Sequence, residues 1–397
     1  MKRYLLFFLL ALAFFSCSTR PPVREIPPTE QGGKAKEEIP PQPESFYLTI
    51  VAAGDNIIHD PLLKASNNNG TYSFDSIYEK IRAYTIPSDI AFINQETIIG
   101  NKALGYSGYP LFSTPRETGA ALAAAGFDVV NHATNHAMDK GEAGVLSTMD
   151  YWESLDGIRY LGIHRTDDAK TNNPVIISKN NIKVGFLAYT YGTNGIALPR
   201  GKPYLVSLIN NATMAKEIDT LRPLCDYLIV SVHWGDEYNP EPSLYQTNLA
   251  AFFAEHNVDL VIGHHPHVLQ RFETLPRDDG KSTFCFYSLG NFLSAHFNPE
   301  KEALLGGLAY VKLKKTVDKI SVEEAGFIPT LTHYDKNQSG FKIYPLSEYT
   351  EELTEKHWKR ARDKNMTLEF FNNRARELYG PMLILKNPFE VSYTASR

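Results

Sequence analysis

From residue 46 onward, short apolar runs rich in β-branched side chains alternate with stretches whose apolar residues follow helical spacing. Two of these helical stretches are residues 117–125, which hold five alanines and one leucine, and residues 245–256. Strands buried on both faces read as continuous apolar runs, so this alternation predicts a layered α/β fold. The predicted strands are residues 47–53, 90–93, 129–130, 184–189, 227–232, 260–262 and 284–288.

The C-terminal part of the chain has a different pattern. Apolar runs at 305–313, 320–327 and 341–343 predict antiparallel strands at the edge of a sheet. Residues 347–379 are strongly charged and carry large apolar side chains at loosely helical spacing, which predicts helices packed on the outside. We therefore expect a main domain over residues 46–345 and a helical extension over residues 346–397.

Residues with metal-binding or acid–base side chains follow the predicted strands. They are Asp55, Glu96, Asn135, His136, His233 and the histidines of the Gly-His-His-Pro-His run at 263–267. Seven of the twelve histidines, counting His59 and His132, fall in these segments. Because ligands of open α/β sheets bind beyond the carboxyl ends of the strands, this distribution predicts a functional site at that edge.

The residue types narrow the chemistry of this site. Carboxylate and amide oxygens together with imidazole nitrogens suit Mn²⁺, Fe or Zn²⁺, and the absence of cysteine from the set argues against a structural zinc site. A metal held by such donors with open positions lowers the pKa of bound water and polarises a phosphoryl or carbonyl oxygen. Metal-assisted hydrolysis is therefore the first hypothesis for the function.

Asn135 and His136 have a specific use in a site of this kind. The amide oxygen binds the metal while the adjacent imidazole reaches the leaving oxygen of the substrate as an acid. Asp139, three residues further on, is placed to hold that imidazole in the required tautomer. The alternative is that this loop merely caps neighbouring helices.

The run at 263–267 is the strongest single signal. Three histidines within four residues are hard to explain structurally, because charging or desolvating adjacent imidazoles without a metal costs stability. Either His264 or His265 reaches a metal together with His267, and the sequence does not choose between them.

Composition and charge exclude several other functions. Forty basic and 45 acidic residues give a net charge of −5, and no run rich in Lys or Arg stands out, so we expect no nucleic-acid partner. The chain has neither a GxSxG nucleophile elbow nor a P-loop. Cys225 and Cys285 lie within or beside apolar strands, which predicts buried rather than nucleophilic thiols.

Residues 1–17 are typical of an export signal. Two basic residues precede an apolar run at 4–15 that is too short to span a bilayer. Its end, Ser16-Cys17, is similar to a bacterial lipoprotein box, in which the cysteine is lipidated; the alternative is a plain secretory signal. Residues 18–45, rich in proline and charge, predict an extended tether. We expect an extracytoplasmic, membrane-anchored lipoprotein of the bacterial cell envelope.

Several motifs together resemble one known family. They are GDNII (54–58), INQE (93–96), FSTP (112–115), AGFDVVNHATNHAMDKG (125–141), VSVHWGDEY (230–238), VIGHHPHVLQ (261–270) and YSLGNF (287–292). In this order, across residues 48–292, they are similar to the CapA family of capsule and poly-γ-glutamate synthesis proteins. The resemblance implies a calcineurin-like metallophosphoesterase fold, a four-layered αββα sandwich with its metal site at the strand ends.

The resemblance also implies site residues by position. The implied metal ligands are Asp55, Glu96, Asn135, His233, His264 and His267, with His136 as acid or phosphate contact. Where the phosphoesterase superfamily has Asp-x-His at its first motif, this chain has Asn56 and Ile57 after Asp55. His59, two residues further on, is either a replacement or a surface residue. The implied cofactor is therefore one or two divalent ions of Mn, Fe or Zn.

The function implied is that of an envelope-anchored protein of capsule or poly-γ-glutamate synthesis or processing, which hydrolyses phosphoester or γ-glutamyl amide bonds. Its expected partners are a capsular polymer or γ-glutamyl peptide, the membrane through lipidated Cys17, and the capsule-synthesis machinery. The alternative is a non-catalytic accessory protein that binds or exports the polymer, and a weaker one is a nucleotidase-like envelope phosphatase. A net charge of −5 does not attract a polyanion, so binding one requires local cations, above all the metal itself.

Overall fold

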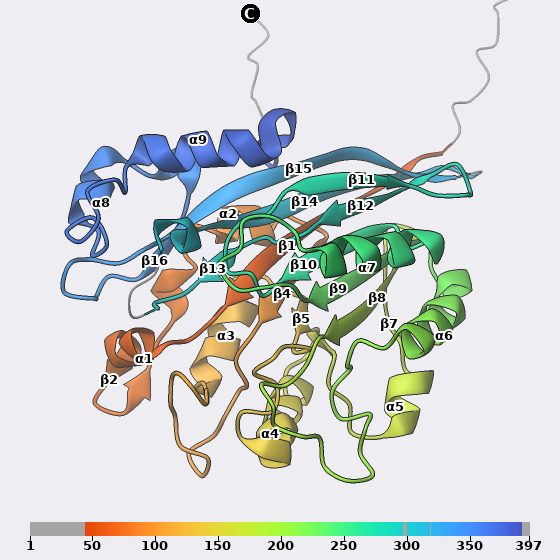
Figure 1. Cartoon of the computed structure of the whole chain (residues 1–397), viewed down its shortest axis with the longest axis horizontal. Coiled ribbons are helices and arrows are strands. Elements are labelled where there is room, and N and C mark those ends of the chain that lie inside the picture. Colours follow the sequence, from red (N-terminus) through yellow and green to blue (C-terminus); the bar gives the residue numbers. More distant parts are fainter. Residues whose placement is uncertain (1–43, 297–299, 318, 391–397) are drawn as a thin grey trace, which may run out of the picture. The chain divides into compact units, whose positions relative to one another are not determined.

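A computed structural model describes residues 44–296, 300–317 and 319–390 of the chain. In these residues, eight strands form the larger of two main sheets (Figure 1). Seven of them follow the order β16-β15-β14-β1-β4-β5-β6, and β13 pairs with β1 beyond this path. The strands are β1 (Phe46–Asn56), β4 (Ile90–Gln95), β5 (Val129–Asn131), β6 (Arg159–Leu161), β13 (Asn291–Leu293), β14 (Leu305–Lys315), β15 (Ile320–His333) and β16 (Lys342–Pro345).

The second main sheet has the order β11-β12-β10-β9-β8-β7. Its central strands β8, β9, β10 and β12 are parallel, whereas β7 and β11 pair antiparallel at the two edges. The strands are β7 (Val175–Lys179), β8 (Ile182–Thr190), β9 (Tyr227–His233), β10 (Leu260–His264), β11 (Phe272–Pro276) and β12 (Ser282–Phe286). A small hairpin of β2 (Asn67–Asn68) and β3 (Thr71–Tyr72) is separate from both sheets.

Helices cover the outer faces of the two sheets, as the side-chain clusters show. In β9, Ile229 belongs to the cluster between the sheets, whereas Leu228 and Val230 pack with residues of α6 and α7. The helices are α1 (Asp60–Ser66), α2 (Arg82–Thr85), α3 (Arg116–Ala124), α4 (Gly141–Glu153), α5 (Asp167–Asn172), α6 (Asn211–Leu221), α7 (Leu244–Glu255), α8 (Glu351–Lys356) and α9 (Leu368–Tyr379). The expected αββα layering is confirmed.

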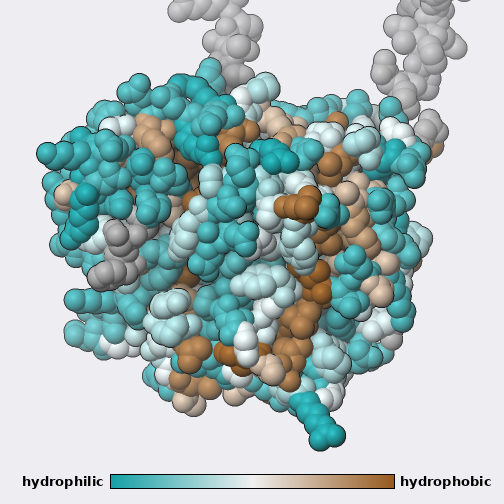
Figure 2. Space-filling model, viewed as in Figure 1, coloured by the Kyte–Doolittle hydropathy of each residue, from teal (hydrophilic) through white to brown (hydrophobic). Residues whose placement is uncertain are grey.

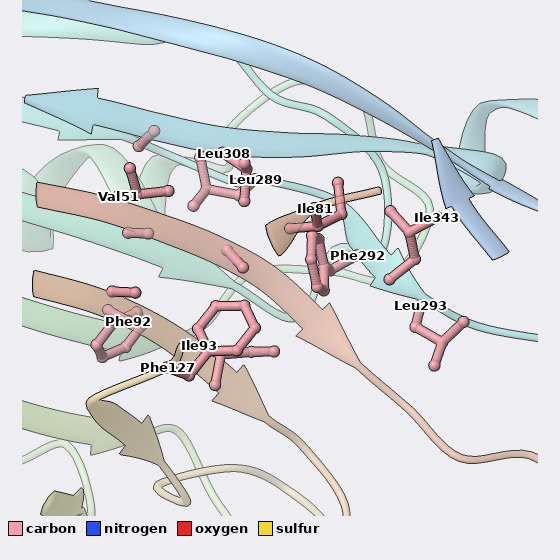
Figure 3. Packing of buried hydrophobic residues seen from close by; sticks show 14 of the residues in the cluster. Val51, Ile81, Phe92, Ile93, Phe127, Leu289, Phe292, Leu293, Leu308 and Ile343 are labelled. Carbon is pink, nitrogen blue, oxygen red and sulfur yellow. The ribbon is translucent and has the colours of Figure 1, made fainter. Parts of the chain in front are cut away.

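Strand β1 lies at the centre of the hydrophobic core. β1 is paired with β4 on one side and with β14 on the other, and its residues from Val51 to Asn56 are buried. In Figure 3, Val51 of β1 lies close to Leu289 and Leu308, and all three residues are fully buried. Because β1 is enclosed on every side, the residues at its carboxyl end are held in a fixed place.

The C-terminal elements continue this structure. β14, β15 and β16 extend the larger sheet as antiparallel strands, with β16 at the edge, which confirms the prediction for this region. α9 packs on the sheet through Tyr379, whose ring stacks on Phe327 with 3.8 Å between the centroids. The Tyr379 hydroxyl donates a hydrogen bond of 2.9 Å to the Gln270 carbonyl oxygen.

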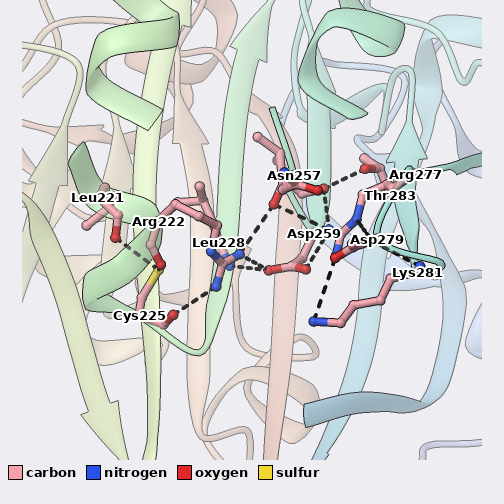
Figure 4. A network of polar contacts seen from close by, with 11 residues as sticks. Leu221, Arg222, Cys225, Leu228, Asn257, Asp259, Arg277, Asp279, Lys281 and Thr283 are labelled. Atoms are coloured by element: carbon pink, nitrogen blue, oxygen red, sulfur yellow. Dashed lines mark hydrogen bonds and ion pairs between the residues drawn. The ribbon is translucent and has the colours of Figure 1, made fainter. Parts of the chain in front are cut away.

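A buried ionic network lies at the amino ends of β9 and β10 (Figure 4). The carboxylate of Asp259 accepts hydrogen bonds from Arg277 at 2.7 Å, from Arg222 and from the backbone N–H of Leu228 at 2.8 Å. The Arg277 side chain is 1% exposed and also pairs with Asp279. A buried charge is tolerated when it is paired and hydrogen-bonded, so this network fixes the strands at the end away from the predicted site.

Within the described residues, no helix is both long and apolar enough to cross a membrane. On the face drawn in Figure 2, hydrophilic side chains predominate, and apolar ones gather in a strip that runs toward the lower edge. Cys285 is buried and Cys225 partly buried, and burial raises the pKa of both thiols. The predicted export signal, Cys17 and most of the predicted tether lie outside the described residues.

Candidate metal centre

The predicted site residues come together where the carboxyl ends of both sheets meet. Asp55 lies near the end of β1, and Glu96 directly follows β4 in the same sheet. His233 ends β9 and His264 ends β10, and these two residues are paired in the register of the second sheet. All four side chains are buried to 1% exposure or less. The two packed sheets thus supply carboxylates from one side and imidazoles from the other.

Two glycines allow the backbones to approach closely at this edge. A Cβ atom on Gly54 would lie 2.1 Å from the carbonyl oxygen of Gly290, and one on Gly263 would lie 2.0 Å from that of Tyr287. Real Cβ atoms do not come so near, so a side chain at either position would force the strands apart. The glycines preceding Asp55 and His264 are therefore part of how these residues are positioned.

Hydrogen bonds orient the carboxylate of Asp55. Its Oδ1 accepts from the Asn94 amide at 2.7 Å, and the Asn94 oxygen in turn accepts from Asn131 at 2.7 Å. Its Oδ2 accepts from the backbone N–H of His265 at 3.2 Å and lies 3.1 Å from His267 Nδ1. The side-chain amides of Asn94 and Asn131 thus hold the negatively charged carboxylate of Asp55 in one orientation.

The pKa of Asp55 reflects these contacts. Burial alone would raise it, but hydrogen bonds and charge interactions with His264 and His267 hold the pKa well below its ordinary value. Asp55 is therefore an ionised, oriented carboxylate and suited to bind a cation.

Glu96 is a buried carboxylate without hydrogen-bond partners among the described residues. Both of its carboxylate oxygens are buried, and neither has a hydrogen bond within the described part of the chain. His233 Nε2 and His267 Nε2 each lie 3.7 Å from Oε1, beyond hydrogen-bond distance. Burial raises the pKa of this carboxyl well above its ordinary value. Since a buried polar group without a partner is costly, the surroundings of Glu96 fit a bound cation.

Three overlapping groups of side chains bring their ligand atoms within 4.8 Å of one another. The groups are Glu96, His233 and His265; Glu237, His265 and His267; and Asp55, Glu96 and His267. They combine carboxylate oxygens with imidazole nitrogens and include no cysteine, which is the donor set that suits Mn, Fe or Zn in a site with open positions.

Four of the predicted ligands, Asp55, Glu96, His233 and His267, belong to these groups. His264 does not, although its Nδ1 lies 3.3 Å from Asp55 Oδ1. Of the two histidines that the sequence left open, His265 is the one inside the groups, and its backbone has the left-handed φ of 96°.

Asn135, also a predicted ligand, contacts the cluster from the side. Its Oδ1 lies 2.9 Å from His233 Nε2, and its amide nitrogen donates to the Asn194 oxygen at 3.3 Å. Glu237 was missed by sequence reasoning. The signal was available, because this acidic residue lies four positions after His233, in the loop that follows β9.

His136 and Asp139 are in direct contact. His136 Nδ1 lies 2.8 Å from Asp139 Oδ2, which also accepts the backbone N–H of Phe112 at 2.7 Å. Phe112 packs edge-on against the imidazole at 4.6 Å between centroids. In the neutral ring this arrangement places the proton on Nδ1 and leaves Nε2 to take up or release a proton.

His132 has a structural role instead. Its Nε2 accepts a hydrogen bond of 2.7 Å from the indole of Trp152, and the side chain is 2% exposed. Burial lowers the pKa of His132 to about 3, so it remains neutral. The first half of the Asn-His-Ala-Thr-Asn-His motif therefore serves the core, and the second half faces the candidate site.

A cavity of about 1000 Å³ adjoins the cluster and is lined by His59, Glu237, Tyr238 and His296 among others. His59 is 6% exposed, so it is not a surface residue, and its ring lies 4.3 Å from that of His296. The His296 ring is in turn 5.4 Å from that of His267. His296 was not anticipated, because no motif marks it in the sequence.

The fold and the site define an α/β protein of αββα architecture with a candidate metal centre at the carboxyl ends of its strands. Residues 49–296 match the model of the family described as bacterial capsule synthesis protein PGA_cap. The chain belongs to this family, as its motifs indicated.

Two curated relatives have related names. The chain is 30% identical over 260 residues to the capsule biosynthesis protein CapA of Bacillus anthracis, covering 63% of this chain and 60% of that protein. It is 31% identical over 183 residues to the PGA biosynthesis protein CapA of Bacillus subtilis (strain 168), covering 45% and 46%. The chain thus spans between about half and three fifths of the relatives it matches.

Solved structures show distant similarity. The NAD nucleotidase of Haemophilus influenzae has a TM-score of 0.46 at 12% identity, covering 84% of this chain and 67% of that one. The calcineurin-like phosphoesterase YfkN of Bacillus subtilis has a TM-score of 0.40 at 15% identity, covering 83% and 100%.

Proposed function

We propose that this protein is a metal-dependent hydrolase of phosphoester or γ-glutamyl amide bonds that acts in the synthesis or processing of a capsular polymer. The observation that carries the proposal is the Glu96 carboxylate, buried with both oxygens unpartnered and surrounded by imidazoles. A buried carboxylate without hydrogen-bond partners is costly, and such costs are found at functional sites. A bound cation would supply the missing partner.

The residues of the three groups would hold the metal, and Asp55 is the member whose charge and orientation are most firmly set. A bound divalent ion would supply Lewis-acid polarisation of the scissile group and a water of lowered pKa. His136 would exchange a proton with the substrate through Nε2, because Asp139 occupies its Nδ1.

The substrate class is supported by the family and by the names of the relatives, which refer to capsule and PGA biosynthesis. Both a phosphoester and an amide carry an oxygen that a metal polarises, so the site chemistry is compatible with either bond. The predicted export signal supports action outside the cytoplasm, with Cys17 as the proposed lipid anchor.

One observation favours the alternative of a non-catalytic polymer-binding protein. Asn56 donates to Gln95 at 2.6 Å and accepts from the Tyr78 hydroxyl at 2.9 Å, and Ile57 is apolar. Neither residue is free to supply the ligand that the superfamily has at this motif. A site with fewer ligands fits a structural or polymer-binding ion.

The decisive experiment loads the full-length protein with Mn²⁺, Zn²⁺ or Fe, measures bound metal by elemental analysis, and assays bis-p-nitrophenyl phosphate and γ-glutamyl peptides. Asp55→Ala and His267→Ala should lose both metal and turnover. His256→Ala is the matched control, because this partly exposed histidine pairs with Asp219 and belongs to none of the three groups. Turnover that survives both site variants, or no turnover with any metal, refutes the hydrolase.

The anchoring is tested separately. Replacing Cys17 by alanine should abolish incorporation of a labelled fatty acid and release the protein from the membrane fraction. Unchanged labelling and fractionation would contradict the lipoprotein assignment.

A further inference from the structure

The cavity beside the candidate metal centre extends to the C-terminal part of the chain. Glu237, which is one of the candidate ligands, lines it at the metal side. Gln338, Trp358 and Arg362 line it as well, and these residues lie beyond residue 296, where the match to the family ends. A volume of about 1000 Å³ is at the upper end for small-molecule sites and exceeds what one phosphate or one glutamyl unit fills.

Arg362 is held rigidly in this wall. Its guanidinium lies over the indole of Trp358, 3.7 Å from the ring centroid, and its Nη1 donates to the Trp358 carbonyl oxygen at 3.0 Å. Trp358 is itself 7% exposed, and its backbone N–H donates to the Tyr334 carbonyl oxygen at 3.0 Å. Stacking on an anchored indole fixes the orientation of the planar guanidinium, so that its remaining N–H groups can bind a carboxylate or phosphate.

The charges around the cavity make this arginine distinctive. Asp60, Glu237 and Glu300 also line the cavity and are acidic, whereas Arg362 is its basic residue apart from histidines. Among the described residues, no carboxylate forms an ion pair with Arg362, although Arg360 and Arg374 nearby in sequence pair with glutamates. Acidic walls repel an anionic ligand everywhere except at Arg362 and at a bound metal ion, so these two points would set its register.

We propose that Arg362, stacked on Trp358, is a subsite for an anionic group that the substrate carries at a distance from the bond to be cleaved. The substrate class is therefore a chain or conjugate with a second carboxylate or phosphate, such as a γ-linked oligoglutamate or an oligophosphate. This inference rests on the proposed function only for the place of cleavage, because binding at Arg362 requires no turnover.

The test measures binding to the full-length protein in EDTA, so that a metal ion does not contribute. The probes are γ-linked triglutamate, tripolyphosphate and the triglutamate methyl ester. Their binding is measured by calorimetry and by tryptophan fluorescence. A change in fluorescence on binding reports on Trp358, because Trp358 lines the cavity and Trp152 and Trp234 do not. One of the two anionic probes should bind, and the ester should bind at least tenfold more weakly.

Variants decide whether Arg362 is responsible. Arg362→Met keeps an unbranched apolar stem and removes the guanidinium, and we expect at least a tenfold loss of affinity for the anionic probe. Arg362→Lys should recover only part of it, because an ammonium cannot form two parallel bonds to one anion. Arg374→Met is the matched control, since Arg374 pairs with Glu377 on α9 and does not line the cavity.

Several results would overturn the subsite. The first is that neither anionic probe binds. The second is that the probe binds Arg362→Met as tightly as it binds the wild type. The third is that Arg374→Met loses as much affinity as Arg362→Met. Binding that depends on Arg362 without turnover under any metal supports the subsite and refutes the hydrolase, so the two ideas fail separately.

Discussion

Replacing Glu96 by glutamine tests whether the carboxylate is present to bind a cation. Both oxygens are buried without a hydrogen-bond partner among the described residues, and glutamine keeps the shape while removing the charge. Without metal, the wild type carries the cost of a buried unpartnered polar group, about 1–3 kcal/mol and more when the group is ionised. We expect the metal-free Glu96→Gln variant to be at least as stable as the wild type.

Bound metal should favour the wild type over the variant. An ion present at about 100 times its Kd stabilises the folded wild type by about 2.7 kcal/mol, which corresponds to roughly 4 °C in Tm for a domain of this size. A neutral amide oxygen attracts a cation less. A tenfold loss of affinity reduces the gain at the same metal concentration to about 1.4 kcal/mol. Metal at this concentration should therefore shift the difference in stability between the two proteins by about 1.3 kcal/mol toward the wild type.

The assay is thermal unfolding of both proteins in EDTA and across a titration with Mn²⁺ or Zn²⁺. Glu117→Gln is the matched control, because Glu117 Oε2 is also buried without a partner but belongs to α3 and to none of the metal-binding groups. The control should shift with metal as the wild type does. A Glu96→Gln variant that is destabilised in EDTA and shifts fully with metal would refute the reasoning.

Three further predictions concern other parts of the molecule. His136→Ala should lower kcat by roughly 10²-fold to 10⁴-fold while bound metal, measured by elemental analysis, stays unchanged; loss of metal would contradict a proton-transfer role. Asp259→Ala should lower the free energy of unfolding in urea by about 3–5 kcal/mol, because it removes the carboxylate that pairs with both Arg277 and Arg222, and an effect below 1 kcal/mol would disprove this. The pKa of His132 is about 3 in the folded protein and ordinarily 6.5, so stability is lost as pH falls below 6.5. Between pH 7.5 and 5.5 the wild type should lose about 1.4 kcal/mol more than His132→Gln, whose amide oxygen still accepts from Trp152, and parallel pH curves would show that His132 is protonated in the folded state.

The sequence alone predicted the architecture well where strands are buried. Residues 47–53, 90–93 and 227–232 all fall within strands of the structure, because continuous apolar runs are the direct mark of burial on both faces. The prediction was wrong at the end of 284–288, since β12 ends at Phe286. The edge strands β7 and β11 were not anticipated; β11 lacks a continuous apolar run, whereas β7 begins with one at 175–177.

Helices α4 and α6 were also missed by the apolar pattern, although each buries one face. Their polar outer faces dilute the signal, and only their contact with a sheet defines them as core elements. By contrast, the alanine-rich helix α3 and the more apolar α7 were predicted within one residue of their bounds.

For the candidate site, too, the sequence predicted some features and not others. Sequence alone determined which residue types gather at the strand ends, since Asp55 and His233 lie at the ends of β1 and β9 and Glu96 directly follows β4. It did not determine which atoms meet. The left-handed backbone at His265 and the loop that carries Glu237 bring these two side chains into the metal-binding groups, while His264 lies outside them.

Only the tertiary structure decided what borders the metal centre. His296 and Arg362 reach the cavity from segments that follow the last predicted site residue by about 30 and about 95 positions. Nothing local in the chain specifies such a meeting. His296 follows β13, which pairs with β1, and Arg362 follows β14, β15 and β16, which extend the same sheet from β1 outward. Local patterns encode burial and chemistry, whereas the packing of distant segments determines which of those chemistries share one cavity.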